Sequence, residues 1–214
     1  MQLYTFFQSS AAYRVRIGLA LKGLSAEPRS VHLGRNEQGD ASYRALNPQG
    51  LVPLLVDDGF VLSQSLAILE YLDEIAPQPP LLPPDARGRA RVRSLAYVIA
   101  CDIHPLQNLG PRQYLARELG RSEAEVLGWT RHWIVRGLGA LEAMAAGHPD
   151  TGRFCHGDTP TLADVCLVPQ LANAERYGCI DAAAWPTLLR IRDACVALEA
   201  FASAAPARQP DAPR

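Results

Sequence analysis

The stretch YTFFQSSAAYRVRIGLAL, Tyr4 to Leu21, changes its pattern at two adjacent serines. The aromatic residues before the serines favour a pleated strand. After the serines, Val15 and Leu19 recur at the spacing of a helix. Ser9 and Ser10 are therefore predicted to lie where a strand ends and a helix begins.

The rest of the first 76 residues also alternates between strand and helix patterns. These patterns predict strands at residues 2–7, 26–33, 52–56 and 60–62, and helices at residues 10–22 and 63–76. The turn Asp57-Asp58-Gly59 separates the last two strands and is typical of an antiparallel hairpin. Together the elements predict an α/β unit with one small mixed sheet covered by helices.

A proline-rich segment, PQPPLLPP at Pro77–Pro84, is the expected domain boundary, because it cannot continue a helix and favours an extended connection. Beyond it the sequence lacks strand alternation, and its patterns predict helices at residues 86–107, 122–146, 161–176 and 186–201. We therefore predict an α/β domain at residues 1–78 and an all-α domain at residues 85–214. The proline-rich tail at 205–214 is expected to lie on the surface or to fray.

Charge and cysteine content exclude several classes of function. The chain has 21 basic and 22 acidic residues, so no net charge draws it to nucleic acid or to an anionic membrane. Its five cysteines include no C-x-x-C pair, and no secretory signal precedes them, which predicts reduced thiols and a cytoplasmic location. No apolar run approaches the roughly 18 to 20 residues that a membrane span needs.

Ser9 and Ser10 are the first candidate site residues. The beginning of a helix has unpaired N–H groups and partial positive charge, which favour an anion. A hydroxyl at this point could donate a hydrogen bond to a thiolate and lower the pKa of that thiol. The other interpretation, which position alone favours, is a helix cap worth about 1 kcal/mol.

Two further segments of the α/β domain suggest a peptide-like ligand. Pro53 interrupts a strand pattern, and a cis Val52–Pro53 bond would leave the Val52 backbone free to pair with a peptide, although a trans bond is the common case. Gln64 and Ser65 lie before a helix, where they could hold a carboxylate or act as an ordinary cap. Together with the serines, these segments favour an anionic, peptide-like thiol ligand.

The helical half offers fewer candidates. Thr161 and Asp164 form a capping-box pattern that predicts the start of a buried helix. Arg176 ends that helix and either neutralises its last carbonyls or binds a substrate carboxylate. His104 is isolated, and the sequence contains no metal-ligand spacing, G-x-S-x-G, phosphate-binding glycine loop or dinucleotide fingerprint. Hydrolase, kinase and dehydrogenase functions are therefore not indicated.

These segments resemble the glutathione transferase superfamily, specifically its zeta class of maleylacetoacetate and maleylpyruvate isomerases. The similarity covers nearly the whole chain and includes SSAAYRVRIGLALKG, ALNPQGLVPLL, SQSLAILEYLDE, PLQNL, TLADVCLVPQLANAERY, LEAF and RQPD. The zeta pattern has cysteine and tryptophan where this chain has Ala11 and Tyr13. Chemistry that requires a protein thiol at this point is thereby excluded.

The resemblance implies a thioredoxin-like N-terminal domain, an all-α C-terminal domain, a homodimer and glutathione as the cofactor. Ser9 and Ser10 would face the glutathione sulfur, and Ala11 would also belong to the glutathione-binding residues. Val52 would pair with the cysteinyl part of glutathione, and Gln64 and Ser65 would hold its γ-glutamyl end. The remaining residues that the resemblance places near the glycyl end or the substrate are Gln38, His104, Asn108, Leu109 and Gly110.

The implied reaction is glutathione-dependent cis–trans isomerisation of a maleyl keto acid to its fumaryl isomer in the breakdown of aromatic compounds. Maleylpyruvate is the preferred substrate and maleylacetoacetate the other, with Arg176 as a clamp for a substrate carboxylate. Two alternatives remain open at this point. One is a general glutathione transferase or peroxidase that acts on electrophiles, and the other is a non-catalytic interaction module with the same fold.

Overall fold

The computed structural model describes residues 1–213, which form two compact units. The first unit contains Met1–Pro80 and the closing segment that begins at Ala197. The second unit is Leu81–Val196. Each unit is described separately below.

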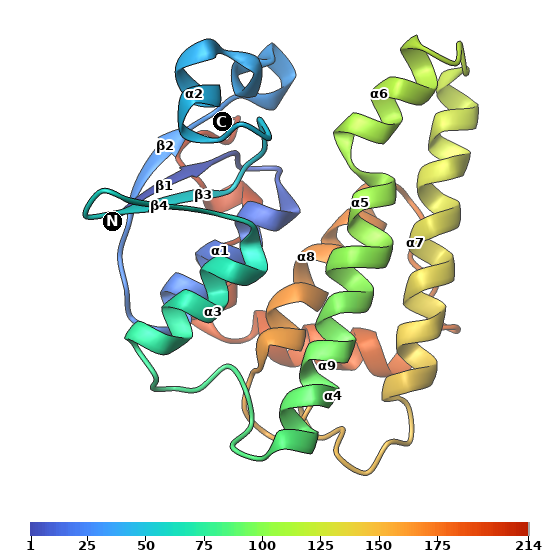
Figure 1. Cartoon of the computed structure of the whole chain (residues 1–214). Helices are drawn as coiled ribbons and strands as arrows, with labels where there is room; N and C mark the ends of the chain where they lie inside the picture. Colours follow the sequence, from blue (N-terminus) through green and yellow to red (C-terminus); the bar gives the residue numbers. More distant parts are fainter. Residues whose placement is uncertain (214) are drawn as a thin grey trace. The chain divides into compact units, whose positions relative to one another are not determined.

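The first unit is built on a four-stranded mixed sheet (Figure 1). The strands are β1 (Gln2–Thr5), β2 (Glu27–Ser30), β3 (Leu54–Asp57) and β4 (Phe60–Ser63), in the spatial order β2-β1-β3-β4. β1 is parallel to β2 and antiparallel to β3, and β3 and β4 form the predicted hairpin. The alternation of strands and helices in the sequence therefore predicted the sheet correctly.

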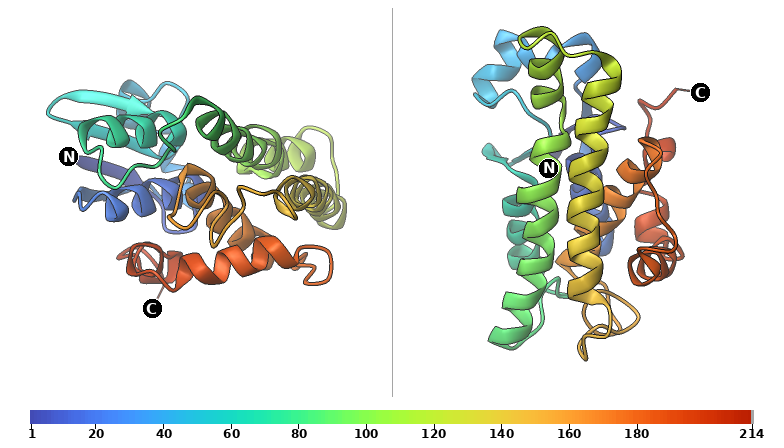
Figure 2. Two further views of the ribbon diagram at one scale, coloured as in Figure 1. Left: turned by 90° about the horizontal axis from the view of Figure 1, so that it is seen from below. Right: turned by 90° about the vertical axis from the view of Figure 1, so that its right-hand side faces the viewer.

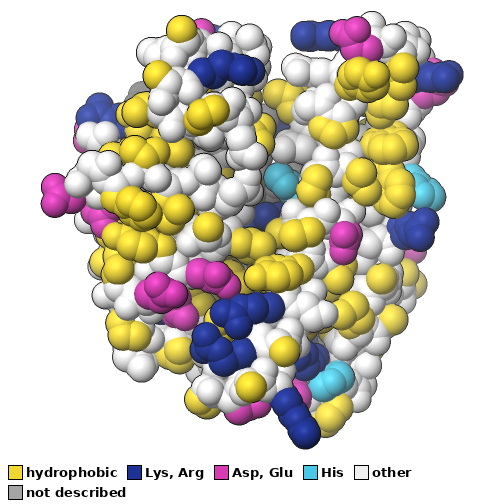
Figure 3. Space-filling model, in the orientation of Figure 1, with side chains coloured by type: hydrophobic (Ala, Val, Ile, Leu, Met, Phe, Trp, Pro, Cys, Tyr) yellow, Lys and Arg dark blue, Asp and Glu magenta, His cyan; other side chains and the backbone are white. Residues whose placement is uncertain are grey.

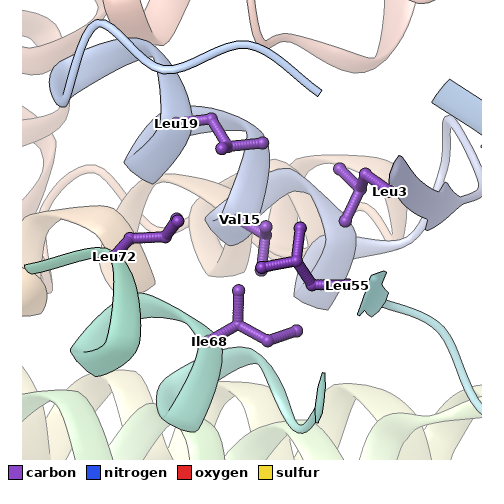
Figure 4. Packing of buried hydrophobic residues seen from close by; sticks show 6 residues of the cluster. All are labelled: Leu3, Val15, Leu19, Leu55, Ile68 and Leu72. Carbon is purple, nitrogen blue, oxygen red and sulfur yellow. The ribbon is translucent and has the colours of Figure 1, made fainter. Parts of the chain in front are cut away.

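Helices α1 (Ser10–Leu21) and α3 (Ser65–Ile75) cover one face of this sheet. Figure 4 shows the buried cluster between them and the strands, to which Leu3, Val15, Leu19, Leu55, Ile68 and Leu72 contribute. Gly18 allows the two helices to approach closely, since a Cβ at this position would lie 2.2 Å from a methyl carbon of Leu69. Helix α2 (Ala41–Leu46) packs on the other face through Tyr43. The sequence patterns had predicted no helix between residues 33 and 52.

The second unit is helical. Its helices are α4 (Ala86–Tyr97), α5 (His104–Gln107), α6 (Leu109–Arg117), α7 (Glu123–Ala145), α8 (Leu162–Arg176) and α9 (Pro186–Val196). A π-helical segment, Val98–Ile103, joins α4 to α5, and the α5 end of this continuous run lies beside α7 (Figure 2). In residues 1–213 no helix combines the length and apolar character that a membrane crossing requires.

The start of α8 confirms the predicted capping box. The Asp164 side chain is fully buried, and its Oδ2 accepts hydrogen bonds from Thr161 N and Thr161 Oγ1, both at 2.8 Å. Its Oδ1 accepts a third bond, from Cys155 N, also at 2.8 Å. Burial raises the pKa of Asp164, and it also raises the pKa of the Cys155 and Cys195 thiols nearby. These two cysteines therefore remain protonated structural residues.

The closing segment differs from the expectation that the all-α domain continues to residue 214. The helix predicted at 186–201 ends at Val196, and the chain then returns to the first unit through the short helix α10 (Glu199–Ala202). The physical reason is that the tail finds hydrogen-bond partners on α1, where Tyr13 Oη donates to Phe201 O at 3.1 Å. The tail is partly exposed but is held in place, although the sequence analysis allowed for fraying; residue 214 lies outside the described residues.

Candidate active site

The junction between β1 and α1 presents a hydroxyl at the start of a helix. Ser9 is the N-cap of α1, and its Oγ accepts a hydrogen bond from Ala12 N at 3.2 Å. The Ser9 side chain is only partly buried, whereas Ser10 and Ala11 are each 7% exposed. Because Ser9 Oγ is used as an acceptor, its own proton remains available for donation. The cap interpretation of Ser9 is therefore confirmed, and its role as a hydrogen-bond donor to a thiolate stays a prediction.

The backbone before β3 offers unpaired hydrogen-bonding groups. The strand begins only at Leu54, and within residues 1–213 the Val52 N–H and C=O form no hydrogen bond. The Val52–Pro53 peptide bond is cis, the less common of the two forms considered. The preceding carbonyl, Leu51 O, is fixed by Tyr43 Oη at 2.6 Å and Asn47 Nδ2 at 2.7 Å. An extended peptide could therefore pair with Val52 at a well-positioned segment.

The start of α3 favours an anion. Its N-cap, Gln64, has φ of 72°, unusual for a residue other than glycine, and its side chain makes no capping bond to the first-turn N–H groups. The next residue, Ser65, accepts a hydrogen bond from Arg14 Nη1 at 3.3 Å. Arg14 is 1% exposed and adds a buried positive charge next to this helix end. Arg14 was not among the predicted site residues; the signal for it in the sequence was a basic residue among the apolar positions of a helix.

These groups fit a thiol tripeptide. A hydroxyl at one helix N-terminus suits a thiolate, the free Val52 backbone suits a peptide unit, and the start of α3 beside Arg14 suits a carboxylate. Gln38 adds a buried Oε1 that has no hydrogen-bond partner among the described residues and could accept a ligand N–H. All of these residues belong to the first unit.

A second group of candidates lies in the second unit, around Tyr177. The guanidinium carbons of Arg176 and Arg112 lie 5.5 and 5.2 Å from the centre of the Tyr177 ring. Arg112 Nη1 also donates to Tyr177 Oη at 2.9 Å, and Arg131 Nε donates to Tyr177 O at 2.7 Å. None of the three arginines forms an ion pair with an acidic residue in the described part of the chain.

This arginine cluster combines residues from three helices that are distant in sequence. Arg112 comes from α6, Arg131 from α7 and Arg176 from the end of α8. The Arg112 Nε is buried without a partner, and the exposed Arg176 guanidinium has no hydrogen bond within residues 1–213. Uncompensated guanidinium groups are typical of sites that bind carboxylates. Of the three arginines only Arg176 was predicted from the sequence, because helix spacing within one segment cannot show which other helices approach it.

The remaining predicted site residues of the second unit lie near the α5–α6 junction. His104 begins α5 and is partly buried. Asn108 caps α6, with its Oδ1 accepting a hydrogen bond from Leu109 N at 2.8 Å. Gly110 is exposed, and a Cβ there would meet open space. The structure therefore gives Asn108 a capping role and leaves the other three as candidates.

Comparison with known proteins identifies the family. Residues 3–80 match the model of the N-terminal domain of glutathione S-transferases, and residues 129–178 match the model of their C-terminal domain. A maleylpyruvate isomerase of Ralstonia sp is 47% identical over 211 residues, which is 99% of each chain. The chain belongs to the glutathione S-transferase family.

Solved structures refine this family assignment. A maleylpyruvate isomerase described as a bacterial glutathione transferase of the zeta class has a TM-score of 0.97 and 47% identity, with all of both chains covered. A maleylacetoacetate isomerase of Methylobacterium extorquens AM1, solved with malonate and glutathione bound, has a TM-score of 0.97 and 44% identity, again over both entire chains. The resemblance to the zeta class and the predicted two-part fold of this family are thus confirmed.

Proposed function

We propose that the chain is a glutathione-dependent cis–trans isomerase that converts maleylpyruvate to fumarylpyruvate, with maleylacetoacetate as the second substrate. The observation that carries this proposal is the partly exposed Ser9 hydroxyl at the N-terminus of α1, in a chain that is 47% identical to a maleylpyruvate isomerase. A related structure holds both glutathione and a dicarboxylate, malonate, which matches a substrate with two carboxylates.

When bound, glutathione supplies a thiolate that adds to the cis double bond and is eliminated after the resulting single bond has rotated. A cysteinyl thiol has a pKa near 8.5, so only a few per cent is ionised at neutral pH without help. Ser9 donates its hydroxyl proton toward the sulfur, and the α1 N-terminus adds partial positive charge. Ser10 is nearly buried and contributes mainly as the first residue of α1.

The other candidate residues orient the two ligands. Val52 pairs with the cysteinyl part of glutathione, and Gln64 and Ser65 hold its γ-glutamyl carboxylate beside Arg14. Ala11 would belong to the same group of glutathione-binding residues, and Gln38 would reach the glycyl end or the substrate. The residues assigned to the substrate or the glycyl end in the second unit are His104, Asn108, Leu109 and Gly110.

Arg176 is proposed to clamp a substrate carboxylate. Its guanidinium is exposed and has no acidic partner among the described residues, and Arg112 adds a second cation at the same tyrosine. Together they stabilise the two carboxylates and the negative charge that develops on the keto acid during addition.

Replacing Arg176 with alanine should raise the KM for maleylpyruvate roughly tenfold or more, because a charge-assisted hydrogen bond of about 1.5 to 3 kcal/mol is lost. The dissociation constant of glutathione should stay nearly unchanged. Steady-state kinetics and calorimetric titration with glutathione measure the two quantities. An Arg136→Ala variant, which removes an exposed arginine of α7 outside this cluster, is the control; equal effects of R176A on both ligands would contradict the clamp.

The direct test of the proposed function is turnover of maleylpyruvate by the purified chain with and without glutathione. Loss of the maleyl absorbance should require glutathione but should not consume it. A parallel assay with a halogenated aromatic tests general transferase activity, and faster conjugation than isomerisation would refute the proposal. Failure to bind glutathione would favour a non-catalytic role. The ratio of kcat/KM for maleylpyruvate and maleylacetoacetate establishes the preferred substrate.

The enzyme is further proposed to act as a homodimer in the cytoplasm, in a route that degrades aromatic compounds. Two apolar side chains of the edge strand β4, Phe60 and Val61, are 53% and 38% exposed, and Leu51, which precedes β3, is 46% exposed. Figure 3 shows hydrophobic side chains gathered on the left part of the visible face, where this hairpin lies. Such a patch is costly to leave in water and is suited to contact with a second copy.

Replacing Phe60 with glutamate should shift the protein from dimer to monomer, because a buried carboxylate without a partner opposes association. We expect the dimer dissociation constant to rise by roughly 100-fold. Sedimentation velocity over a concentration series measures it, and Val135→Glu, at an exposed valine of α7, is the matched control. An unchanged dimer in F60E would remove β4 from the proposed interface.

A further inference from the structure

The closing segment of the chain contacts the loop that precedes the candidate site serine. Three hydrogen bonds connect the segment to residues 7–16. They run from Tyr13 Oη to Phe201 O at 3.1 Å, from Arg16 Nε to Ala204 O at 3.0 Å, and from Phe7 N to Asp211 Oδ2 at 2.9 Å. All of these residues belong to the first unit.

Arg16 also connects the tail to the same loop. Its side chain is 8% exposed, and it donates to Phe6 O at 3.4 Å and to Phe7 O at 3.1 Å. Burial lowers the pKa of Arg16 to about 10, with the Asp211 charge acting in the opposite direction, so the guanidinium is charged at neutral pH. The Arg16 guanidinium therefore holds the carbonyls of Phe6 and Phe7, and Asp211 holds the Phe7 amide.

This contact reaches Ser9 through a single turn. Asp211 accepts a hydrogen bond from the Phe7 amide. The carbonyl of the preceding residue, Phe6, accepts a hydrogen bond from Ser9 N at 2.9 Å. The backbone from Phe6 to Ser9 thus forms a turn that is closed by the hydrogen bond from Ser9 N to Phe6 O. The tail fixes this turn at Phe7. A shift of Phe7 would move the Ser9 hydroxyl with it.

We propose that Asp211 is a positioning residue for the glutathione thiolate, because it fixes the Phe6–Ser9 turn from the C-terminal tail. The proposal rests on the proposed function, which gives Ser9 its role. Asp211 acts through the backbone of Phe7 and does not itself contact the cofactor. The RQPD segment is, in this view, part of the active-site framework.

The test compares Asp211→Ala with Asp211→Asn in the full-length chain. D211A leaves the Phe7 N–H without its acceptor, so we expect about tenfold less thiolate of bound glutathione at pH 7 and a roughly tenfold lower kcat. The KM for maleylpyruvate should change less than about twofold. D211N keeps an acceptor oxygen and should retain activity within about threefold of the unmodified enzyme.

Two controls separate positioning from general stability. Ser30→Ala removes the other group that donates to Asp211 Oδ2, at 3.4 Å, and leaves the Phe7 bond intact. Asp193→Ala removes an exposed carboxylate of the second unit that, within residues 1–213, pairs only with its neighbour Arg192. Both controls should match the unmodified enzyme in thiolate absorbance and kcat.

Hydrogen exchange at the amides of residues 7–9 is the readout that does not depend on turnover. It should accelerate in D211A and stay near the unmodified rate in D211N. Equal behaviour of D211A and D211N, or unchanged exchange in D211A, would overturn the positioning role. If the unmodified chain bound glutathione but failed to isomerise maleylpyruvate, the proposed function would fail, while thiolate absorbance and exchange would still decide the role of Asp211.

Discussion

Replacing Ser9 with alanine should lower kcat for maleylpyruvate by about 30- to 100-fold at pH 7. The hydroxyl supplies a hydrogen bond to a charged acceptor, worth about 1.5 to 3 kcal/mol, and its loss raises the pKa of the bound thiol by one to two units. The acid limb of the pH–rate profile should therefore move to higher pH by about the same amount. Ultraviolet absorbance of the bound thiolate over a pH series checks the shift directly.

The same substitution also removes the cap of α1, so its effect on stability must be separated from its effect on catalysis. Loss of a serine cap costs about 1 kcal/mol. Ser122 provides the matched control, since it caps α7 and its Oγ accepts a hydrogen bond from Glu125 N at 3.3 Å. Ser122→Ala should lose comparable stability but no activity. If S9A kept the normal thiolate absorbance, the donor role of Ser9 would be wrong.

Replacing Asp164 with alanine should have the largest effect on stability, a loss of about 3 to 5 kcal/mol in the free energy of unfolding. Three buried donors, Thr161 N, Thr161 Oγ1 and Cys155 N, would lose their acceptor at once. Each buried donor left without a partner costs about 1 to 3 kcal/mol, and the costs within one network are not additive. Urea denaturation followed by circular dichroism measures the loss.

The pH dependence of this loss has a definite sign. Because burial raises the pKa of Asp164, the native chain holds its proton more tightly than the unfolded chain does. The contribution of this carboxyl is then complete below its unfolded pKa of about 3.9 and declines as the pH rises through the native pKa. The deficit of D164A should therefore not shrink as the pH falls from 7 toward 4.

Asp85 is the contrasting control, because it caps α4 at an exposed position. A hydrogen bond from Gly88 N lowers the pKa of Asp85, so its contribution exists above its unfolded pKa and disappears as the pH falls through the native pKa. Asp85→Ala should cost much less at neutral pH than D164A does. Equal losses in the two variants would mean that burial of the Asp164 network adds nothing beyond ordinary capping.

Local sequence patterns predicted the elements whose stability is local. The β1–α1 junction, the β3–β4 hairpin and the capping box at Asp164 all depend on residues within a few positions of one another. The patterns did not predict α2 or α6. Helix α2 has only six residues, and α6 carries a glycine and a proline in its first turn, so neither shows a sustained helical repeat.

Local sequence patterns predicted only part of the candidate site. Ser9, Gln64 and Arg176 stand at helix ends, which the sequence marks directly. Arg14 and Arg112 are candidate site residues only because of their contacts with residues that are distant in the sequence. Arg14 lies against Ser65, 51 positions away, and Arg112 lies against Tyr177, 65 positions away.

The sequence alone determined the four strands of the sheet and the capped starts of the main helices, because short-range spacing and hydrogen bonding specify them, and its motifs carried the likeness to the zeta class. Only the tertiary structure decided that the tail returns to the first unit, that Asp211 meets Phe7 across 204 positions, and that arginines from three helices gather at Tyr177. The physical reason is that buried polar groups need hydrogen-bond partners, and packing of the core brings these partners close from distant parts of the chain. No local pattern in the sequence indicates which distant segment supplies the partner.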